Sequence, residues 1–494
     1  MPRGRPATKN GTSKRLGSQQ SVDQAIKSIC DIMRRGNCAG AMQYVPELTW
    51  ILFLRILDER EEREAEEAEA LGIDFSPPLE KAPQNSFFNF VNKKLLPYLR
   101  GLERAPSASP RQKVISEIMS GVERVRIDTE RNLLDVLDKV HELTGEAVDT
   151  AHVFALSQVY EGLLLKMGEK GNDGGQFFTP RQVIKAMVRV IDPRLGECIY
   201  DPGCGTGGFL AQSYEHIVGG LGNDATAEQL EALKQRSFWG REKEKLVYPM
   251  APANLVLHGI DKPNLWHGNT LTGQETYGGL FEGAPQAFDV ILTNPPFGGK
   301  EGKEAQTNFD YKTGATQVLF LQRVIRDLKE GGRCGIVLDE GFLFRTNEEA
   351  FAKTKRKLLD DCELWCVVSL PGGVFTAAGA GVKTDLLFFT KGKQTRKIWY
   401  YDLSNVKVGK RTPLAHFEEF FNLLPKRAGS ENSWVVDFAA KRKAAAAQAA
   451  PLKARALRKI AGGRAGEGSR RERCPDSRVQ GARRDVEAIG CLAL

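Results

Sequence analysis

From about residue 197 to residue 390 the chain alternates short apolar runs with longer amphipathic segments. Helical patterns such as FLAQSYEHIV and TQVLFLQRVIRDLKEGG separate several of the runs. This alternation is typical of a doubly wound parallel sheet, so we expect an α/β fold with a Rossmann-like sheet whose ligands bind at the carboxyl ends of the strands. The predicted strands are ECIYD, SFWGRE, FDVILTN, GRCGIVLD, LWCVVSL and KTDLLFFT.

Composition and apolar spacing divide the chain into four parts. Residues 1–20 are rich in Gly, Ser, Lys and Arg, which predicts a disordered basic leader. Residues 21–165 place apolar residues three and four apart, as in VDQAIKSICDIM, which predicts a mostly helical domain. We expect the α/β domain at 166–440 and a basic tail, partly helical or disordered, at 441–494.

The net charge of +8 is concentrated at the two ends of the chain. Residues 1–20 carry +5 and residues 441–494 carry +9, which leaves −6 for residues 21–440. The two basic arms could contact phosphate groups, or they could be solvated disordered ends.

The nine cysteines form no CxxC pair and no Cys/His cluster at zinc spacing, so we expect free thiols and no metal site. No apolar run approaches the roughly 20 residues that cross a bilayer, and the N-terminus lacks the apolar region of a signal peptide. We therefore expect a cytoplasmic protein that does not enter a membrane.

The segment GECIYDPGCGTGGFLAQSYEHI predicts a strand, a glycine-rich turn and a helix. Gly203, Gly205 and Gly208 match the pattern GxGxxG, with Gly207 between them. Glycines there permit a tight turn and let a ligand approach the backbone closely. Alone the match is weak, because a nicotinamide dehydrogenase or a purely structural turn would show the same pattern.

Two carboxylates accompany this turn. Asp201 ends the strand before it, and Glu242 ends the next predicted strand. A carboxylate at the end of the second strand can accept hydrogen bonds from both ribose hydroxyls, so Glu242 indicates a ribose rather than one particular cofactor. The alternative is a surface glutamate among charged neighbours.

The segment FDVILTNPPFGG predicts a buried strand that runs out into Asn294, Pro295, Pro296 and Phe297. Asn294 follows Asp201 by 93 residues, which allows two strand and helix units between them and a loop at the same edge of the sheet. A strand that simply ends in a turn is the alternative interpretation.

These four residue types suit the methylation of an exocyclic amine. The N6 lone pair of adenine is delocalised into the ring, and acceptors aimed at both N–H groups favour a pyramidal nitrogen and the positive charge that develops on it. Asn294 offers a side-chain carbonyl and Pro295 a backbone carbonyl, which Pro296 holds in an extended segment. Phe297 offers a flat face to a base that has left the helix.

Together the motifs resemble the N6-adenine DNA methyltransferases, and specifically the modification (methylase) subunit of type I restriction-modification systems. DPGCGTGGFL is similar to the cofactor loop of that family, NPPF to its catalytic tetrapeptide, and GQFFTP to the segment that covers the methionine end of the cofactor. The resemblance continues through GNTL, GGRCGIVLDEGFLF and LPGGVFTAAGAGVKTDLLFF, and it covers residues 21 to about 440.

The resemblance implies transfer of a methyl group from S-adenosylmethionine to N6 of adenine in DNA, on a Rossmann-like methyltransferase sheet preceded by a helical domain. It implies that Asn294, Pro295, Pro296 and Phe297 are catalytic, and that Phe297 and Phe375 form the base pocket. Asn269 stands where the family often has Asp, and a neutral amide can make the same contact with the cofactor. The implied cofactor-binding residues are Gln176, Phe177, Phe178, Thr179, Pro180, Asp201, Gly203, Gly205, Thr206, Gly207, Gly208, Glu242 and Asn269.

The resemblance also implies partners: DNA, a DNA-specificity subunit with two methylase chains per specificity chain, and a restriction/translocase subunit. Once the helical domain and the sheet are placed, residues 21–440 leave no segment for a sizeable base-reading domain, which favours a separate specificity subunit. The alternatives are an N-methyltransferase for a protein glutamine or an RNA amine, a non-catalytic subunit of a DNA complex, and, more distantly, a dehydrogenase.

Overall fold

The computed structural model describes most of the chain, with gaps. The predicted leader and tail lie almost wholly outside the described residues, as does the predicted domain boundary at residue 165. The described residues are 19–36, 38, 47–55, 65–66, 68–70, 72, 87–141, 179–221, 225–245, 247–260, 262–279, 283–375, 383–407 and 417–447.

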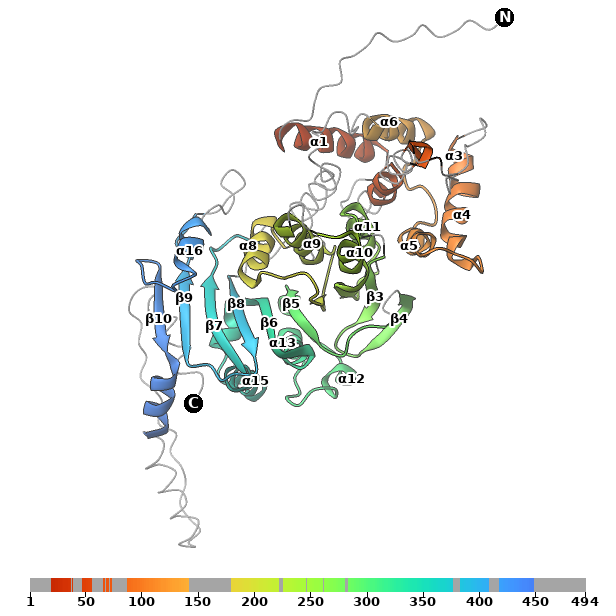
Figure 1. The fold of residues 1–494 in the computed structure, drawn as a ribbon. Helices are drawn as coiled ribbons and strands as arrows, with labels where there is room; N and C mark the ends of the chain where they lie inside the picture. The colour runs from red at the N-terminus through yellow and green to blue at the C-terminus, as the bar shows by residue number, and fades with distance from the viewer. Residues whose placement is uncertain are drawn as a thin grey trace, which may run out of the picture.

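The first described part of the chain is helical, and its helices share one hydrophobic core (Figure 1). Ser109 begins one of them with a capping box, in which its side chain and that of Gln112 each accept a hydrogen bond from the other residue's backbone N–H. Besides a helix at residues 47–55, the elements are α1 (Gln19–Arg35), α3 (Phe87–Phe90), the π-helical turn Val91–Leu95, α4 (Leu96–Gly101), the 3₁₀ turn Leu102–Arg104, α5 (Pro110–Met119) and α6 (Glu130–His141).

The rest of the described chain builds one ten-stranded sheet in the order β10-β9-β7-β8-β6-β5-β1-β2-β3-β4. Its strands are β1 (Ile199–Asp201), β2 (Phe238–Glu242), β3 (Asn264–Asn269), β4 (Gln274–Gly279), β5 (Phe288–Thr293), β6 (Leu328–Asp339), β7 (Cys362–Ser369), β8 (Thr384–Lys391), β9 (Lys397–Asp402) and β10 (Ser433–Asp437). Its helices are α8 (Arg181–Ile191), α9 (Gly208–Leu221), α10 (Ala227–Arg236), α11 (Met250–Leu257), α12 (Lys303–Gln306), α13 (Thr316–Asp327), α14 (Glu340–Phe344), α15 (Glu349–Asp361) and α16 (Phe417–Leu423).

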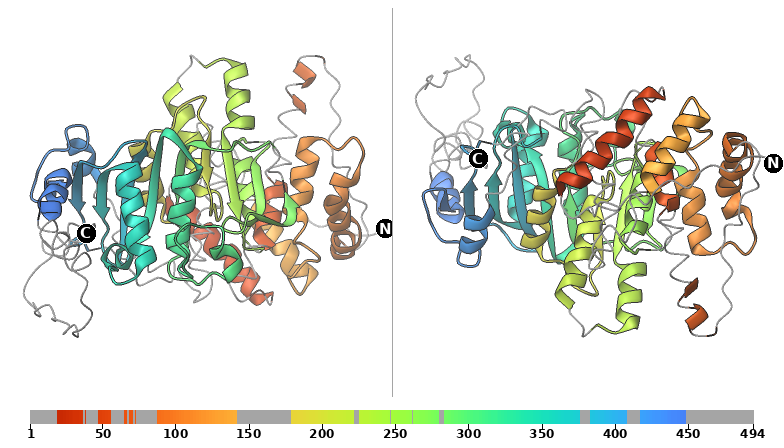
Figure 2. Two further views of the ribbon diagram at one scale, coloured as in Figure 1. Left: turned by 90° about the horizontal axis from the view of Figure 1, so that it is seen from below. Right: turned by 90° about the horizontal axis from the view of Figure 1, so that it is seen from above.

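Helices cover both faces of the sheet, which the two views of Figure 2 show. Successive residues of a strand point to opposite faces, so Ile199 of β1 belongs to the core beside α8, α9 and α11, whereas Tyr200 belongs to the core beside α13 and α15. Strands that are buried on both faces appear in a sequence as continuous apolar runs, which is why β1 and β5 are recognisable there.

The predicted fold class, an α/β sheet preceded by a helical region, is confirmed. The sheet is parallel across β6-β5-β1-β2-β3 and again between β7 and β9. Strand β8 lies antiparallel between β6 and β7, and β4 and β10 pair antiparallel at the two edges. An apolar run in the sequence does not indicate whether the adjacent strand runs parallel or antiparallel to it. Periodicity therefore could not distinguish a parallel sheet from this mixed one. The predicted strands all form, but β3, β4, β9 and β10 are not among the predictions, and β6 begins at Leu328, inside a predicted helix.

The helical region lies against the sheet domain at α11 (Figure 1). Met250 and Ala253 of α11 are buried in the hydrophobic core of the helical region, although they belong to the chain segment that forms the sheet domain. The two parts of the chain therefore share a helix.

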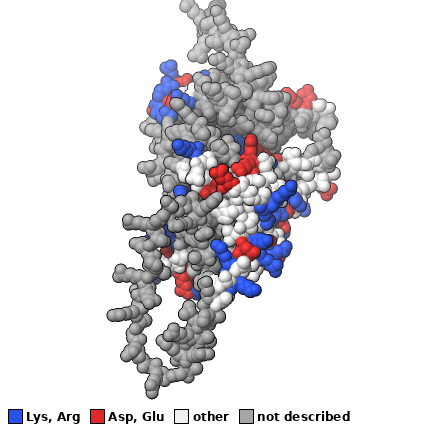
Figure 3. All heavy atoms as spheres, turned by 90° about the vertical axis from the view of Figure 1, so that its left-hand side faces the viewer, with Lys and Arg blue, Asp and Glu red and all other residues white. Residues whose placement is uncertain are grey.

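After β10, which forms the edge of the sheet opposite β4, residues 438–447 are helical. Arg442 forms an ion pair with Asp360 of α15 at 2.7 Å, and Phe438 is buried. Figure 3 shows Lys and Arg beside Asp and Glu among the described residues of this side, so the described part of this face does not carry charge of one sign.

Candidate active site

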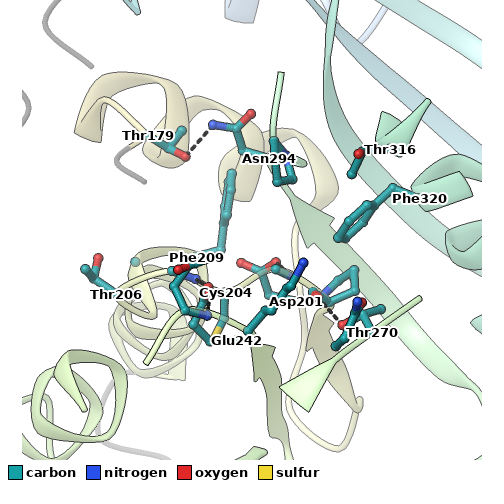
Figure 4. Close-up of a pocket in the computed structure, with 18 of the residues that line it drawn as sticks. Thr179, Asp201, Cys204, Thr206, Phe209, Glu242, Thr270, Asn294, Thr316 and Phe320 are labelled. Carbon is teal, nitrogen blue, oxygen red and sulfur yellow. Dashed lines mark hydrogen bonds between the residues drawn. The ribbon is translucent and has the colours of Figure 1, made fainter. Parts of the chain in front are cut away.

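A cavity of about 330 Å³ lies at the carboxyl ends of the parallel strands, where the fold predicts a ligand site. Asp201 at the end of β1, Glu242 at the end of β2 and Asn294 directly after β5 line it (Figure 4). Asn269 at the end of β3 lines it as well. The two motifs that the sequence separates by 93 residues therefore face one cavity, because β1 and β5 are neighbouring parallel strands.

The structure brings most of the predicted site residues together. Pro180, Gly207, Pro295, Phe297 and Phe375 are near the site but do not line the cavity, and Gln176, Phe177 and Phe178 lie outside the described residues. The predicted residues that line the cavity are Thr179, Asp201, Gly203, Gly205, Thr206, Gly208, Glu242, Asn269, Asn294 and Pro296.

The glycine turn between β1 and α9 needs glycine at two positions. Gly205 has φ 54° and Gly207 has φ 78°, backbone conformations that residues other than glycine rarely adopt. The turn is held to the sheet by Asp201, whose Oδ1 accepts a hydrogen bond from the Gly203 N–H at 3.1 Å. Burial raises the pKa of Asp201 to about 7.

Glu242 is tied to the same turn by both carboxylate oxygens. Oε2 accepts a hydrogen bond from the Gly205 N–H at 2.8 Å, and Oε1 accepts one from the Glu244 N–H at 2.8 Å. Glu242 is 8% exposed, so it is not the surface glutamate of the alternative interpretation, and burial raises its pKa. Each oxygen keeps a lone pair with which it can accept a hydrogen bond from a ligand hydroxyl.

Asn269 caps the turn that follows β3. Its Oδ1 accepts a hydrogen bond from the Leu271 N–H at 2.9 Å, so the Nδ2 donor is the end of the amide that can be offered to a ligand. An aspartate at this position could serve the turn in the same way but could offer the ligand only acceptors.

The Asn294 side chain has one end engaged and the other end free. Its Nδ2 donates to Thr179 Oγ1 at 3.0 Å, the contact drawn as a dashed line in Figure 4. Its Oδ1 is buried and has no hydrogen-bond partner among the described residues. A buried carbonyl without a donor costs free energy, so this atom is suited to receive an N–H group from a ligand.

Phe297 and Phe375 contact each other next to the cavity. Their ring centroids lie 5.2 Å apart with an interplanar angle of 83°, an edge-to-face pair. Phe297 is half-buried, whereas Phe375 is 1% exposed and belongs to the core beneath the sheet. Phe375 thus supports Phe297 in this structure, and its assignment as a second wall of a base pocket stays a prediction.

Comparison with known proteins identifies the family. A family model described as N-6 DNA Methylase matches residues 152–432, and one described as HsdM N-terminal domain matches residues 22–139. The Escherichia coli type I restriction enzyme EcoEI methylase subunit is 36% identical over 420 residues, which cover 81% of this chain and 82% of that protein. The chain belongs to the type I restriction enzyme methylase subunits.

Solved structures agree with this assignment. A modification subunit of a putative type I restriction enzyme from Vibrio vulnificus YJ016 is 32% identical, with a TM-score of 0.72 over 85% of this methylase subunit and 93% of that chain. A chain from a structural study of complex assembly in a type I R-M system is 37% identical, with a TM-score of 0.69 over 86% of this chain and 89% of that one. The predictions of the family and of an adenine-specific DNA methyltransferase are confirmed.

All of the cavity lies within the N-6 DNA Methylase match of this methylase subunit. The sequence predictions missed Asn254 of α11, and Thr316 and Phe320 of α13, which also line it. Thr316 and Phe320 stand four residues apart at the start of a helix and so lie on one face, but nothing in TQVLF distinguishes a cavity wall from a core face. The Phe320 ring lies over the glycine turn, where a Cβ at Gly203 would be 3.6 Å from it.

Among the helices that the structure describes, none is long and apolar enough to cross a membrane.

Proposed function

We propose that this methylase subunit uses S-adenosylmethionine to methylate N6 of adenine in DNA, with the glycine turn and Glu242 holding the cofactor and Asn294 holding the amine. The observation that carries the proposal is the free Oδ1 of Asn294 beside the same cavity as the glycine turn. When bound, S-adenosylmethionine supplies an electrophilic methyl group.

The residues present fit such a cofactor. The cavity volume lies in the range of small-molecule sites, which begins at about 300 Å³. Buried Glu242 supplies acceptors for ribose hydroxyls, Asn269 supplies a donor, and the glycines leave backbone groups open to a ligand. Thr179, which lines the cavity directly before α8, would cover the cofactor from that side.

In the proposed reaction Asn294 Oδ1 and the Pro295 carbonyl accept hydrogen bonds from the two N–H groups of adenine. This favours a pyramidal nitrogen with a localised lone pair and stabilises the positive charge that develops on it as the bond from N6 to the methyl carbon forms. The bond between the methyl carbon and the sulfonium sulfur would break, its electron pair would stay on the departing thioether, and the surplus N6 proton would pass to solvent. Asn294 is a neutral amide, so it stabilises charge rather than removing a proton. Phe297 stacks on the base, and Phe375 fixes the orientation of the Phe297 ring.

We also propose that the chain acts in a complex with a separate DNA-specificity subunit, with two methylase chains per specificity chain, and with a restriction/translocase subunit. Its membership of the type I family supports this proposal. A gel shift with the purified chain tests it: the chain alone should bind DNA without site preference, and tight, site-selective binding by this chain alone would contradict a separate specificity subunit.

The substrate class is tested with radiolabelled S-adenosylmethionine and separate DNA, RNA and protein acceptors, with and without the proposed partner subunits. Label should enter DNA adenine when the full set of subunits is present. The Asn294→Ala variant in the same complex serves as the control for transfer at this cavity. Label that enters RNA or a protein glutamine, but not DNA, would refute the proposed substrate.

A further inference from the structure

Helix α11 is buried on two sides by two different hydrophobic cores. Met250, Ala253 and Val256 belong to the core of the helical region, whereas Ala251 and Leu255 belong to the core beneath the sheet. These spacings of three and four residues define two faces of one helix. Because both faces are covered, α11 cannot shift without disturbing the packing on one side or the other.

The sheet-side face of α11 also touches the glycine turn. A Cβ at Gly207 would lie 3.5 Å from the Ala251 carbonyl oxygen and 3.5 Å from the Leu255 side chain. The glycine at 207, with its φ of 78°, therefore lets the turn lie directly against the helix.

Asn254 forms the polar link between α11 and the turn. Its side chain is buried, with the residue 1% exposed, and its Nδ2 donates to the Thr206 carbonyl oxygen at 2.9 Å. Both Asn254 and Thr206 line the cavity (Figure 4 labels Thr206). The two residues are 48 positions apart in the chain, so this contact exists only in the folded protein.

The C-terminal end of α11 is fixed to the helix that follows the turn. His258 Nδ1 lies 2.7 Å from the Asn254 carbonyl oxygen, and His258 Nε2 lies 3.3 Å from Glu215 Oε1 of α9. Since α9 begins at Gly208, directly after the turn, these contacts hold α11, the turn and α9 as one unit.

We propose that Asn254 is a positioning residue for cofactor binding, which holds the Thr206 carbonyl and thereby the shape of the glycine turn. The proposal rests on the proposed binding of S-adenosylmethionine in this cavity. Without the Nδ2 donor the Thr206 carbonyl loses its buried partner, and the turn can relax away from the conformation that the cofactor needs. Asn254 acts through the Thr206 carbonyl of the glycine turn, so we expect its effect on binding.

The test compares Asn254→Ala with a matched variant, Asn264→Ala. Asn264 is 5% exposed, and its Nδ2 also donates to a backbone carbonyl, that of Gln235 at 2.8 Å, but it does not line the cavity. Both variants lose one buried amide and should lose similar stability in thermal unfolding. Calorimetry of the full chain should show a Kd for S-adenosylmethionine about tenfold higher in Asn254→Ala and within about twofold of wild type in Asn264→Ala.

Turnover separates positioning from catalysis. At saturating S-adenosylmethionine the complex containing Asn254→Ala should keep kcat within about twofold of wild type, because only the binding step has lost an interaction. If the alanine variant does not fold, Asn254→Leu keeps a similar side-chain volume and removes the donor without adding a charge, and its Kd should rise by at least the same factor.

The outcomes distinguish this inference from the proposed function. If the wild type does not bind S-adenosylmethionine, the proposed cofactor is wrong and the inference fails with it. If the wild type binds and the Asn254 variant binds equally well, or if both asparagine variants lose the same affinity, the proposed cofactor stands and the positioning role is overturned.

Discussion

Thr179 Oγ1 accepts a hydrogen bond from the Asn294 Nδ2 group at 3.0 Å, and this contact leaves the Oδ1 end of the Asn294 amide available. The Oδ1 acceptor has no partner among the described residues, whereas the Nδ2 donor is occupied. An amine substrate needs acceptors, so this orientation of the Asn294 amide is the one that serves the proposed reaction.

Asn294→Ala should leave cofactor binding near the wild-type value while methyl transfer falls by a factor on the order of 10² to 10³. The expected loss is that of one preorganised hydrogen-bond partner of a developing charge. Calorimetry measures the Kd for S-adenosylmethionine, and transfer of label to DNA by the complex measures kcat. Unchanged turnover would refute the catalytic role of Asn294.

Thr179→Val should lower kcat about fivefold, which corresponds to about 1 kcal/mol for the loss of one orienting hydrogen bond. Valine matches threonine in shape but cannot accept from Asn294 Nδ2, and Thr179→Ser should restore most of the activity because it retains the hydroxyl. Steady-state kinetics of both variants provide the measurement. A rise in the Kd for the cofactor with an unchanged kcat would show that Thr179 acts on the cofactor alone.

Gly205→Val should abolish measurable cofactor binding. Gly205 has φ 54°, a conformation that a β-branched residue adopts only with strain, and the new side chain would stand at the cavity wall. The matched control is Gly219→Ala in α9, where an added Cβ meets no atom within 4 Å. Replacing this helical glycine should be neutral or stabilising by up to about 1 kcal/mol, with the Kd unchanged.

Asp201 should make the free energy of unfolding depend on pH. Its pKa is about 7 in the folded protein and about 3.9 in an unfolded chain. Between these values the folded chain holds a proton that the unfolded chain has released, so stability falls as pH rises. Compared with Asp201→Asn, the wild type should lose up to about 1.4 kcal/mol per pH unit between about pH 4 and pH 7.

Urea unfolding of the cofactor-free protein at several pH values measures this effect. The asparagine variant keeps an oxygen that can accept from the Gly203 N–H, so it removes the titration rather than the contact. If the free energies of unfolding of the wild type and Asp201→Asn differ by the same amount at every pH, Asp201 ionises normally in the folded state.

The parts of the site that could be predicted from sequence are those in which strand, turn and functional residue are contiguous. Asp201 with its glycines and Asn294 with its prolines each follow a continuous apolar run, and parallel pairing of β1 and β5 brings them to one edge. Strand β3, with the sequence NLWHGN, contains too many polar residues and glycines to be recognised by an apolar pattern. Asn254 was missed because it occupies one polar position in an otherwise ordinary buried helix.

The α/β class, the two loops and the chemical groups that they carry can be predicted from the amino-acid sequence, because these features depend on residues close together along the chain. Three other features are visible only in the folded protein: β8 runs antiparallel, Thr179 leaves the Asn294 carbonyl free, and Asn254 holds the Thr206 carbonyl. The two side-chain contacts join groups that are 48 and 115 residues apart in the chain. A local periodicity cannot specify them, since their energies arise only when the cores on both sides of the sheet and of α11 are packed.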